Sequence, residues 1–246
     1  MSTPWGGEAE LTLVVDPPAG DAAGQLDRGL ELLRDVAAGS RVPTLRVYRP
    51  SPTVAFGQRD ARLDGFPGAS AASRAHGFEP LIRRAGGRAA AYHSGCLVVD
   101  HIEPASDAVA GTRARFAAFG DFFAGVLAEV GVDAGVGEIP GEYCPGEFSV
   151  HGRRDAVPAT KLVGTAQRVV AGAWLFSSVL VIEDSAPLRA VLTDVYAALG
   201  LPWRNSTAGA AEDLVPGLRV DVVQDALLAA YRAVVHLETP EASRPS

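Results

Sequence analysis

Lysine is nearly absent from this sequence of 246 residues. Of its 22 basic residues, Lys161 is the one lysine and the other 21 are arginines. Such a bias replaces lysine with arginine wherever either residue serves, so the remaining lysine is expected where a compact, titratable ammonium is needed. Chance survival of a single lysine is the plain alternative. Lys161 is therefore a candidate functional residue whose neighbours in the sequence have to be considered.

Cysteine, positive charge and long apolar runs are also scarce. The two cysteines, Cys96 and Cys144, are too few for a disulfide framework and lack the spacing of a zinc site. The net charge of -7 argues against nucleic acid as a partner, because phosphate binding needs a basic field. No segment approaches the roughly 20 apolar residues of a membrane span, and the N-terminus lacks the pattern of a signal peptide. These absences predict a cytoplasmic protein without a metal, nucleic acid or membrane partner.

Apolar residues are plentiful, at 48% of the chain, which is enough to fill a sizeable core. Apolar stripes at helical spacing predict helices over residues 20–38, 112–130, 188–199 and 220–234. Strands are expected over residues 11–16, 44–48, 53–56, 81–84, 89–101, 148–151, 161–170 and 174–182. Because strands outnumber helices and come in hairpins, the pattern predicts one α+β or mixed α/β domain over residues 1–237. Residues 238–246 are expected to form a flexible tail.

A glycine pair follows two arginines in the segment Arg83-Arg84-Ala85-Gly86-Gly87 and precedes a predicted strand. Paired glycines let the backbone turn tightly and approach a ligand without interference from Cβ atoms. No Gly-Lys-Ser/Thr follows, so this is not the phosphate loop of nucleotide-binding proteins. An ordinary turn and a ligand-binding loop both fit the segment.

The two cysteines differ in their surroundings. Cys96 begins an apolar strand and is expected in the core, whereas Cys144 lies in a Gly/Pro-rich loop where it is able to meet a substrate. Lys161 begins a strand, and alternation places Val163 and Thr165 on the same face. If the Cys144 loop lies above that strand, the ammonium would stabilise a thiolate and bind the oxyanion of an acyl-transfer intermediate. An incidental loop cysteine is the alternative.

The histidines carry a weaker signal. His93 follows the glycine pair and is a candidate substrate contact, although its type and place favour a strand histidine satisfied by its neighbours. His76 and His236 are expected on helix surfaces, and His151 in a turn. The sequence shows no Ser/His/Asp pattern and no spacing typical of metal ligands.

Three segments together resemble the biotin/lipoate protein ligase family in its lipoate branch. They are the turn and short strand from Tyr48 to Gln58, the twin-arginine and glycine-pair segment from Arg83 to His93, and the Lys-x-x-Gly-x-Ala-Gln segment from Lys161 to Gln167. Each segment alone is unspecific, but their order and spacing match the family over about residues 25 to 183. The Cys144 loop shortly before the lysine is similar to the cysteine-dependent octanoyltransferases, which move octanoyl from the glycine cleavage H protein to lipoyl domains.

The resemblance implies one catalytic domain with a mixed sheet flanked by helices. It also implies that Cys144 takes an acyl group as a thioester and that Lys161 orients the acyl carbonyl and supports the thiolate. A target lysine would then attack the thioester, with no cofactor and no ATP. The expected partners are the glycine cleavage H protein, the lipoyl domains of 2-oxoacid dehydrogenases and an acyl carrier protein, and both octanoyl and lipoyl stay open as the acyl group. The residues expected to bind substrate are Arg83, Arg84, Gly86, Gly87, His93, Gly164, Thr165 and Ala166.

The main alternative is an ATP- and magnesium-dependent lipoate protein ligase, which would form an adenylate and tolerate the loss of Cys144. Two departures from the ligase pattern disfavour it: Arg88 stands where ligases commonly have a glycine, and Ser94 where they have aspartate. The chain also leaves no room for the accessory domain of the ligases, which again favours a transferase. A segment at 153–160 before Lys161 is longer than the resemblance predicts. The second alternative is a non-catalytic protein of the same fold that binds acyl groups and is never acylated.

Overall fold

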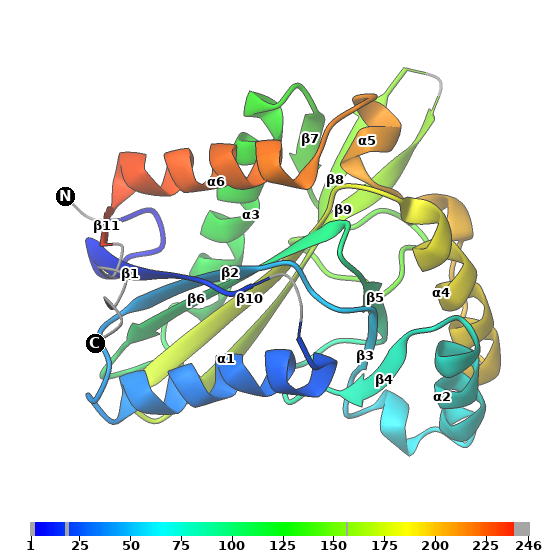
Figure 1. Ribbon diagram of the computed structural model, residues 1–246, viewed down its shortest axis with the longest axis horizontal. Helices are drawn as coiled ribbons and strands as arrows, with labels where there is room; N and C mark the ends of the chain where they lie inside the picture. Colours follow the sequence, from blue (N-terminus) through cyan, green and yellow to red (C-terminus); the bar gives the residue numbers. More distant parts are fainter. Residues whose placement is uncertain (1–2, 18–19, 156, 239–246) are drawn as a thin grey trace, which may run out of the picture.

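The central feature of the computed structural model, which describes residues 3–17, 20–155 and 157–238, is a mixed sheet of eight strands (Figure 1). The strands are β1 (Glu10–Val15), β2 (Thr44–Tyr48), β6 (Cys96–Pro104), β7 (Asp133–Val136), β8 (Val150–Arg154), β9 (Val157–Val170), β10 (Ala173–Val181) and β11 (His236–Glu238). Their order is β11-β1-β2-β6-β10-β9-β8-β7. β1 runs parallel to β2 and β11, and the other neighbours are antiparallel. The mixed α/β architecture expected from the sequence is confirmed.

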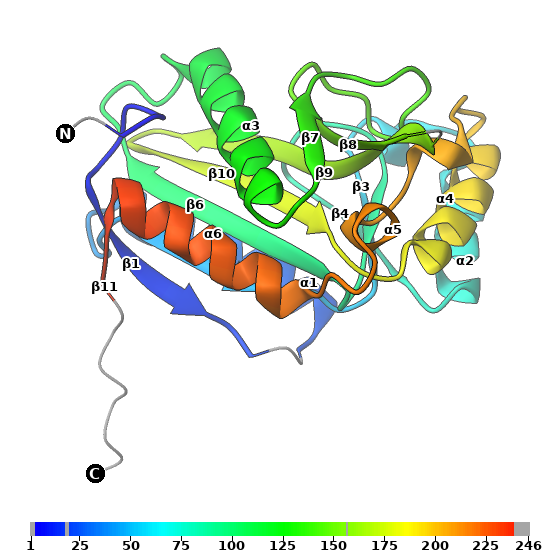
Figure 2. The same ribbon diagram turned by 90° about the horizontal axis from the view of Figure 1, so that it is seen from above.

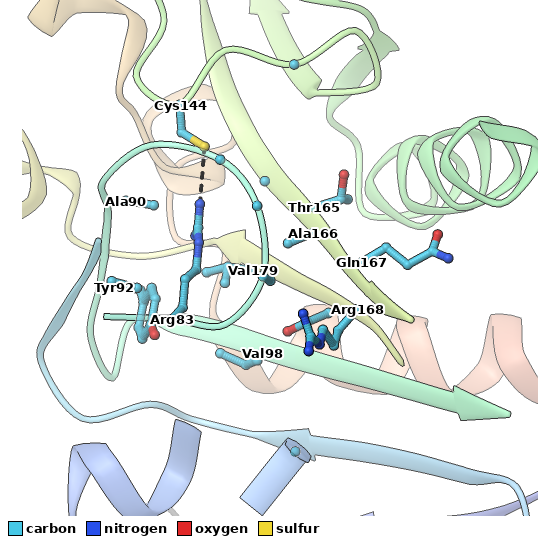
Figure 3. A pocket seen from close by; sticks show the side chains of 18 of the residues that line it. Arg83, Ala90, Tyr92, Val98, Cys144, Thr165, Ala166, Gln167, Arg168 and Val179 are labelled. Carbon is cyan, nitrogen blue, oxygen red and sulfur yellow. Dashed lines mark hydrogen bonds between the residues drawn. The ribbon is translucent and has the colours of Figure 1, made fainter. Parts of the chain in front are cut away.

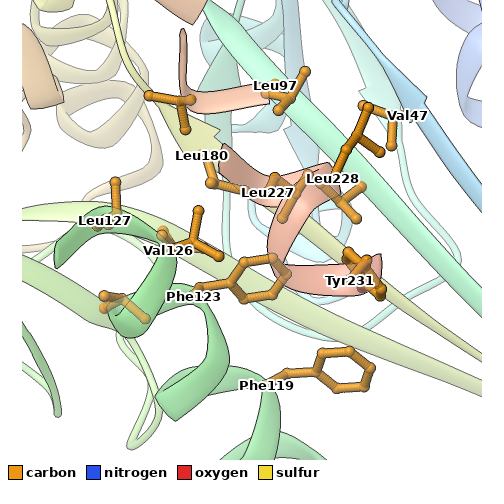
Figure 4. Packing of buried hydrophobic residues seen from close by; sticks show 14 of the residues in the cluster. Val47, Leu97, Phe119, Phe123, Val126, Leu127, Leu180, Leu227, Leu228 and Tyr231 are labelled. Carbon is orange, nitrogen blue, oxygen red and sulfur yellow. The ribbon is translucent and has the colours of Figure 1, made fainter. Parts of the chain in front are cut away.

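Helices cover both faces of this sheet. α3 (Thr112–Glu129) and α6 (Val220–Val234) lie on one face, and α1 (Ala22–Ala37) lies on the other (Figures 1 and 2). Side chains alternate along a strand, so Leu97 on β6 and Leu180 on β10 join the core under α3 and α6 (Figure 4). The aromatic rings of Phe119 and Phe123 from α3 and Tyr231 from α6 fill the same core. The alternate residues of β6 and β10 therefore face α1.

A second, smaller sheet stands beside the α1 face. It contains β3 (Thr53–Phe56), β4 (Glu79–Ile82) and β5 (Ala90–Tyr92) in the order β4-β3-β5. The helices that pack together beside it are α2 (Phe66–Ala75) and α4 (Ser185–Leu199) (Figure 1). The remaining short helices are η1 (Asp60–Arg62), η2 (Asn205–Thr207) and α5 (Ala211–Leu214). The small sheet and α4 share a separate core that includes Val54, Phe56 and Val191.

The four predicted long helices are confirmed, and so is the buried position of Cys96. The single strand expected over residues 89–101 is wrong, because residues 93–95 break it into β5 and β6, which belong to different sheets. The chain passes close to Glu183 at this break, where a Cβ on Gly95 would lie 2.6 Å from the Glu183 carbonyl oxygen. Likewise, β2 and β3 flank one turn but enter different sheets.

Three further expectations are corrected. His236 lies on β11, paired with β1, and not on a helix, while His151 is buried on β8 and not in a turn. The segment at 153–160 does not interrupt the hairpin, because β9 already begins at Val157 and pairs with β8 through β-bulges. His76 ends α2 and is exposed, as expected. Of the predicted tail, Glu238 ends β11, and residues 239–246 lie outside the described residues.

Candidate active site

A cavity of about 470 Å³ opens on the α1 face of the main sheet. Its floor includes Val98 of β6 and Val179 of β10, whose side chains point away from the α3 and α6 core (Figure 3). Its walls are the small sheet, the loop at 83–88, residues 161–168 of β9 and the loop that carries Cys144. The cavity therefore brings together the three segments on which the family resemblance depends.

Cys144 lies half-buried in the wall of this cavity, in the loop between β7 and β8. Its sulfur accepts hydrogen bonds from the backbone N–H of Arg88, at 3.2 Å, and from the Arg83 guanidinium, at 3.4 Å (Figure 3). A cationic donor and a backbone N–H favour the negatively charged form of a bound group. The surroundings of this sulfur therefore suit a thiolate nucleophile.

The backbone of Cys144 is held in an unusual conformation. Its φ is +43°, in the left-handed region that residues other than glycine seldom adopt and that costs on the order of 1–3 kcal/mol. Such a conformation persists where neighbouring groups over-determine it. At Cys144 those groups are Lys161 and Tyr196.

Lys161 fixes the loop through its ammonium group. Nζ donates to the carbonyl oxygen of Cys144 at 2.7 Å, to that of Tyr143 at 3.2 Å and to the Glu142 carboxylate at 3.1 Å. Lys161 is 2% exposed and Glu142 is 3% exposed, so this ion pair is buried. The Glu142 carboxylate also accepts hydrogen bonds from the Gly146 N–H and the Ser149 hydroxyl. The pair thus connects both ends of the Cys144 loop to β9.

These contacts change the role that the sequence suggested for Lys161. The structure places the lysine beside Cys144, as expected, but its ammonium contacts the backbone carbonyl of Cys144 and the sulfur takes its donors from Arg83 and Arg88. The sulfur is therefore supported by the loop at residues 83–88, which we call the glycine-pair loop. Contact of Lys161 with an acyl carbonyl stays a prediction.

Tyr196 on α4 fixes the other side of the loop. Its hydroxyl accepts the Cys144 N–H at 2.7 Å and donates to the Ala89 carbonyl at 2.9 Å, which links the cysteine to the glycine-pair loop. Nothing in the sequence singles out this residue, because it lies within an apolar helical stripe. Glu142 was identifiable only by its place two residues before the cysteine.

Tyr196→Phe is expected to lower the free energy of unfolding by about 1–3 kcal/mol, because it leaves the Cys144 N–H and the Ala89 carbonyl without a partner. Urea denaturation measures the loss. Tyr92→Phe is the matched control, since Tyr92 is also buried in the cavity wall and its hydroxyl has no hydrogen bond within the described part of the chain. Equal stability of the two variants would contradict the bridging role of Tyr196.

The two thiols are expected to differ in reactivity. Cys96 is fully buried, and this burial raises the pKa of its thiol to about 12, so almost none of it is thiolate at pH 8. Cys144 is half-buried and its sulfur faces two donors. Iodoacetamide at pH 8 should therefore add one carbamidomethyl group, at Cys144, as located by peptide mass spectrometry. Comparable labelling of Cys96 would contradict this assignment.

Seven of the eight residues expected to bind substrate line the cavity: Arg83, Arg84, Gly86, Gly87, Gly164, Thr165 and Ala166. The eighth, His93, is not among the lining residues. One ring nitrogen of His93 accepts the Gly95 N–H, and the other lies 2.9 Å from the Asp184 carbonyl oxygen. Its position fits the alternative of a strand histidine satisfied by its neighbours.

Among the described residues, one group of side chains lies close enough to share a metal ion, namely Glu10, His236 and Glu238. All three are exposed at the β11 edge of the sheet, away from the cavity, and exposed acidic groups are common without a metal.

Known proteins are similar to this chain over most of its length. The family model of the lipoyl protein ligase A/B catalytic domain matches residues 21–231. An octanoyl-[GcvH]:protein N-octanoyltransferase of Geobacillus kaustophilus is 29% identical over 181 residues, which cover 74% of this chain and 62% of that protein. The protein of the same name from Exiguobacterium sibiricum is 28% identical over 206 residues, covering 78% of this chain and 71% of that protein. The match therefore spans less than two thirds of the Geobacillus protein.

Solved structures show the same fold. A lipoate-protein ligase A bound with ATP superposes with a TM-score of 0.73 at 20% identity, covering 96% of this chain and 90% of that one. A bipartite lipoate protein ligase from Thermoplasma acidophilum gives a TM-score of 0.62 at 19% identity, with coverages of 98% and 88%. Since the family model matches most of the sequence, the chain belongs to the lipoyl protein ligase A/B catalytic domain family.

Proposed function

We propose that this protein transfers an octanoyl group from a carrier protein to the acceptor lysine of a lipoyl domain, through a thioester on Cys144. The observation that carries the proposal is the Cys144 sulfur in the cavity wall, hydrogen-bonded by the Arg88 N–H and the Arg83 guanidinium. Relatives named octanoyl-[GcvH]:protein N-octanoyltransferases support octanoyl as the group and the glycine cleavage H protein as the donor.

The reaction balances in two steps. The Cys144 sulfur attacks the carbonyl carbon of an octanoyl-lysine amide, the C–S bond forms, the C–N bond breaks, and the carrier lysine leaves as an amine with the thiol proton. The amine of the acceptor lysine then attacks the thioester, forming a new amide and releasing the thiol. Because one amide is broken and an equivalent amide is formed, the transfer requires no ATP.

The cavity provides an apolar surface for the acyl chain. Val98 and Val179 form the part of the floor near the Cys144 loop, and Ala55, Ala90 and Ala91 of the small sheet line the opposite wall. Burial of each methylene against such a surface stabilises the complex by about 0.8 kcal/mol. Octanoyl offers a chain that gains from this contact, and lipoyl and an acyl carrier protein donor stay open within the same chemistry.

The proposal is tested by incubating the protein with octanoylated glycine cleavage H protein and an unmodified lipoyl domain, without ATP. Mass spectrometry of the lipoyl domain should show added octanoyl with the wild type and none with Cys144→Ala. A Cys144→Ala variant that acts at the wild-type rate, or activity that requires ATP and a free acid, would support the ligase alternative. Binding of octanoyl groups without any transfer would support a non-catalytic protein.

A further inference from the structure

The floor of the cavity changes from apolar to polar with distance from the Cys144 loop. The first row of floor residues contains Val98 and Val179, which pair with each other and, on the β9 side, with Gly164. Two residues further along the strands, or about 7 Å, the next row contains Asp100 and Ser177, opposite Ala166 of β9. The row with Val98 and Val179 is the one nearer to Cys144. It includes Gly164, where a Cβ would contact the Lys161 side chain, and the Lys161 ammonium group binds the Cys144 carbonyl oxygen.

The second row belongs to a buried charged group that we call the polar cluster, made of Arg46, Asp100 and Ser177. Arg46 of β2 is 1% exposed and donates to Asp100 at 2.9 Å, and the Ser177 hydroxyl donates to the other Asp100 oxygen at 2.6 Å. Arg46 also pairs with Asp16 at 2.7 Å. Asp100 and Ser177 line the cavity directly. An apolar group that covers the half-buried Ser177 beside the charged Asp100 would displace water without offering a hydrogen bond, which is unfavourable.

Helix α1 covers the cavity at the polar cluster. A Cβ on Gly29 of α1 would lie 3.0 Å from Asp100 Oδ2 and 3.7 Å from the Leu175 side chain, so the helix passes directly over this row. In the third row, Ile102 and Leu175 pack under Leu33 and its neighbours in α1, and Leu175 still lines the cavity. A chain that runs along the floor from Cys144 therefore meets the polar cluster beneath α1, before it reaches Leu175.

We propose that the polar cluster sets the length of the acyl chain that the site accepts, an inference that rests on the proposed function. Methylenes that lie over Val98 and Val179 gain from burial, whereas a chain long enough to reach Asp100 places its apolar end against a buried carboxylate. Arg46, Asp100 and Ser177 are thus specificity-determining residues that do not touch the reacting atoms.

The test measures the rate of acyl-adduct formation on the protein with six-, eight-, ten- and twelve-carbon acyl thioesters of N-acetylcysteamine. While the chain stays on the apolar floor, each added methylene should raise kcat/KM about fourfold. Beyond eight carbons the rate should fall, and the ratio of the ten-carbon to the eight-carbon rate is the readout. Because both rates are measured on the same variant, a general loss of stability lowers both of them and leaves their ratio unchanged.

Two variants probe the polar cluster. Arg46→Met/Asp100→Leu replaces the buried Arg46–Asp100 pair with apolar side chains and leaves only Asp16, which is in contact with water, without its partner; it should raise the ratio about tenfold. Ser177→Ala leaves the ion pair in place and should raise it a fewfold, which keeps the test valid if the double variant fails to fold. Ser178→Ala is the matched control, because Ser178 is buried on the opposite face of the same strand and is outside the cavity lining.

An unchanged ratio in every folded variant would overturn the inference while leaving the proposed function intact. An increase with Ser178→Ala equal to that with Ser177→Ala would also overturn it. Absence of an adduct on the wild type with every thioester and also with octanoylated glycine cleavage H protein would contradict the proposed function itself, and the inference with it.

Discussion

Lys161→Met is expected to lower the free energy of unfolding by about 3–5 kcal/mol and to slow acylation of Cys144. The substitution removes one partner of a buried ion pair and leaves the Glu142 carboxylate without its cation. It also removes the donor to the carbonyl oxygens of Tyr143 and Cys144, so the cysteine loses a group that holds its left-handed backbone. Stability and reactivity should therefore fall together.

Urea denaturation and the rate of iodoacetamide labelling measure the two effects. The matched variant is Glu142→Gln/Lys161→Met, which removes both charges and should recover a substantial part of the lost stability, because no buried charge is left unpaired. The double variant should still react slowly, since the two carbonyls have no donor. A Lys161→Met protein with the urea midpoint and the thiol reactivity of the wild type would contradict the role given to Lys161.

Gly87→Ala is expected to reduce acylation by roughly a hundredfold, since misplacement of reacting groups by about 1 Å has effects of that size. Gly87 has a φ of +101°, and a Cβ there would lie 2.8 Å from the Cys144 sulfur and closer still to the Arg83 guanidinium. The Cys144 sulfur and the Arg83 guanidinium would therefore have to move away from the positions in which they form their hydrogen bond. The backbone strain should also cost on the order of 1–3 kcal/mol of stability.

The neighbouring glycine supplies the control. A Cβ at Gly86 would meet nothing within 4 Å, and Gly86 is not among the glycines with a positive φ. Gly86→Ala should therefore retain nearly the stability of the wild type and lose much less activity than Gly87→Ala. If the two alanine variants lose activity equally, the close approach of Gly87 to the sulfur is not what the reaction depends on.

The contacts of Lys161 explain why this position holds a lysine and not an arginine. The Lys161 ammonium fits into a space bounded by three oxygen acceptors at 2.7, 3.1 and 3.2 Å, all on the Cys144 loop. A planar guanidinium presents its donors in a fixed fork and needs more room than a compact ammonium.

Much of the fold was predictable from local patterns. The stripe on residues 112–130 gave α3 because a helix of this length must bury one face, and the same argument gave α1, α4 and α6. The break at residues 93–95 was not predictable, because it depends on the distant strands with which β5 and β6 pair in two different sheets. Sheet membership is also nonlocal, so nothing near the turn after Tyr48 indicated that β2 and β3 belong to different sheets.

The candidate site also contains some residues that were predictable from the sequence and others that were not. Cys144, Lys161 and the glycine pair stood out by composition and spacing, and the structure brings them to one cavity. The donors to the sulfur were not evident, because one is a backbone N–H and the other depends on how the loop at 83–88 folds. Tyr196 and Asp100 lie far from the cysteine in the sequence, and only the packing of α4 and β6 places them at the cavity.

The most direct test of a thioester on Cys144 is the intact mass of the protein after incubation with octanoylated glycine cleavage H protein and no acceptor. The expected result for the wild type is one added octanoyl group that hydroxylamine releases. The Cys144→Ser variant should carry no octanoyl group that hydroxylamine releases. A wild-type protein that transfers octanoyl to a lipoyl domain but never carries the group itself, even on rapid quenching, would contradict the covalent mechanism.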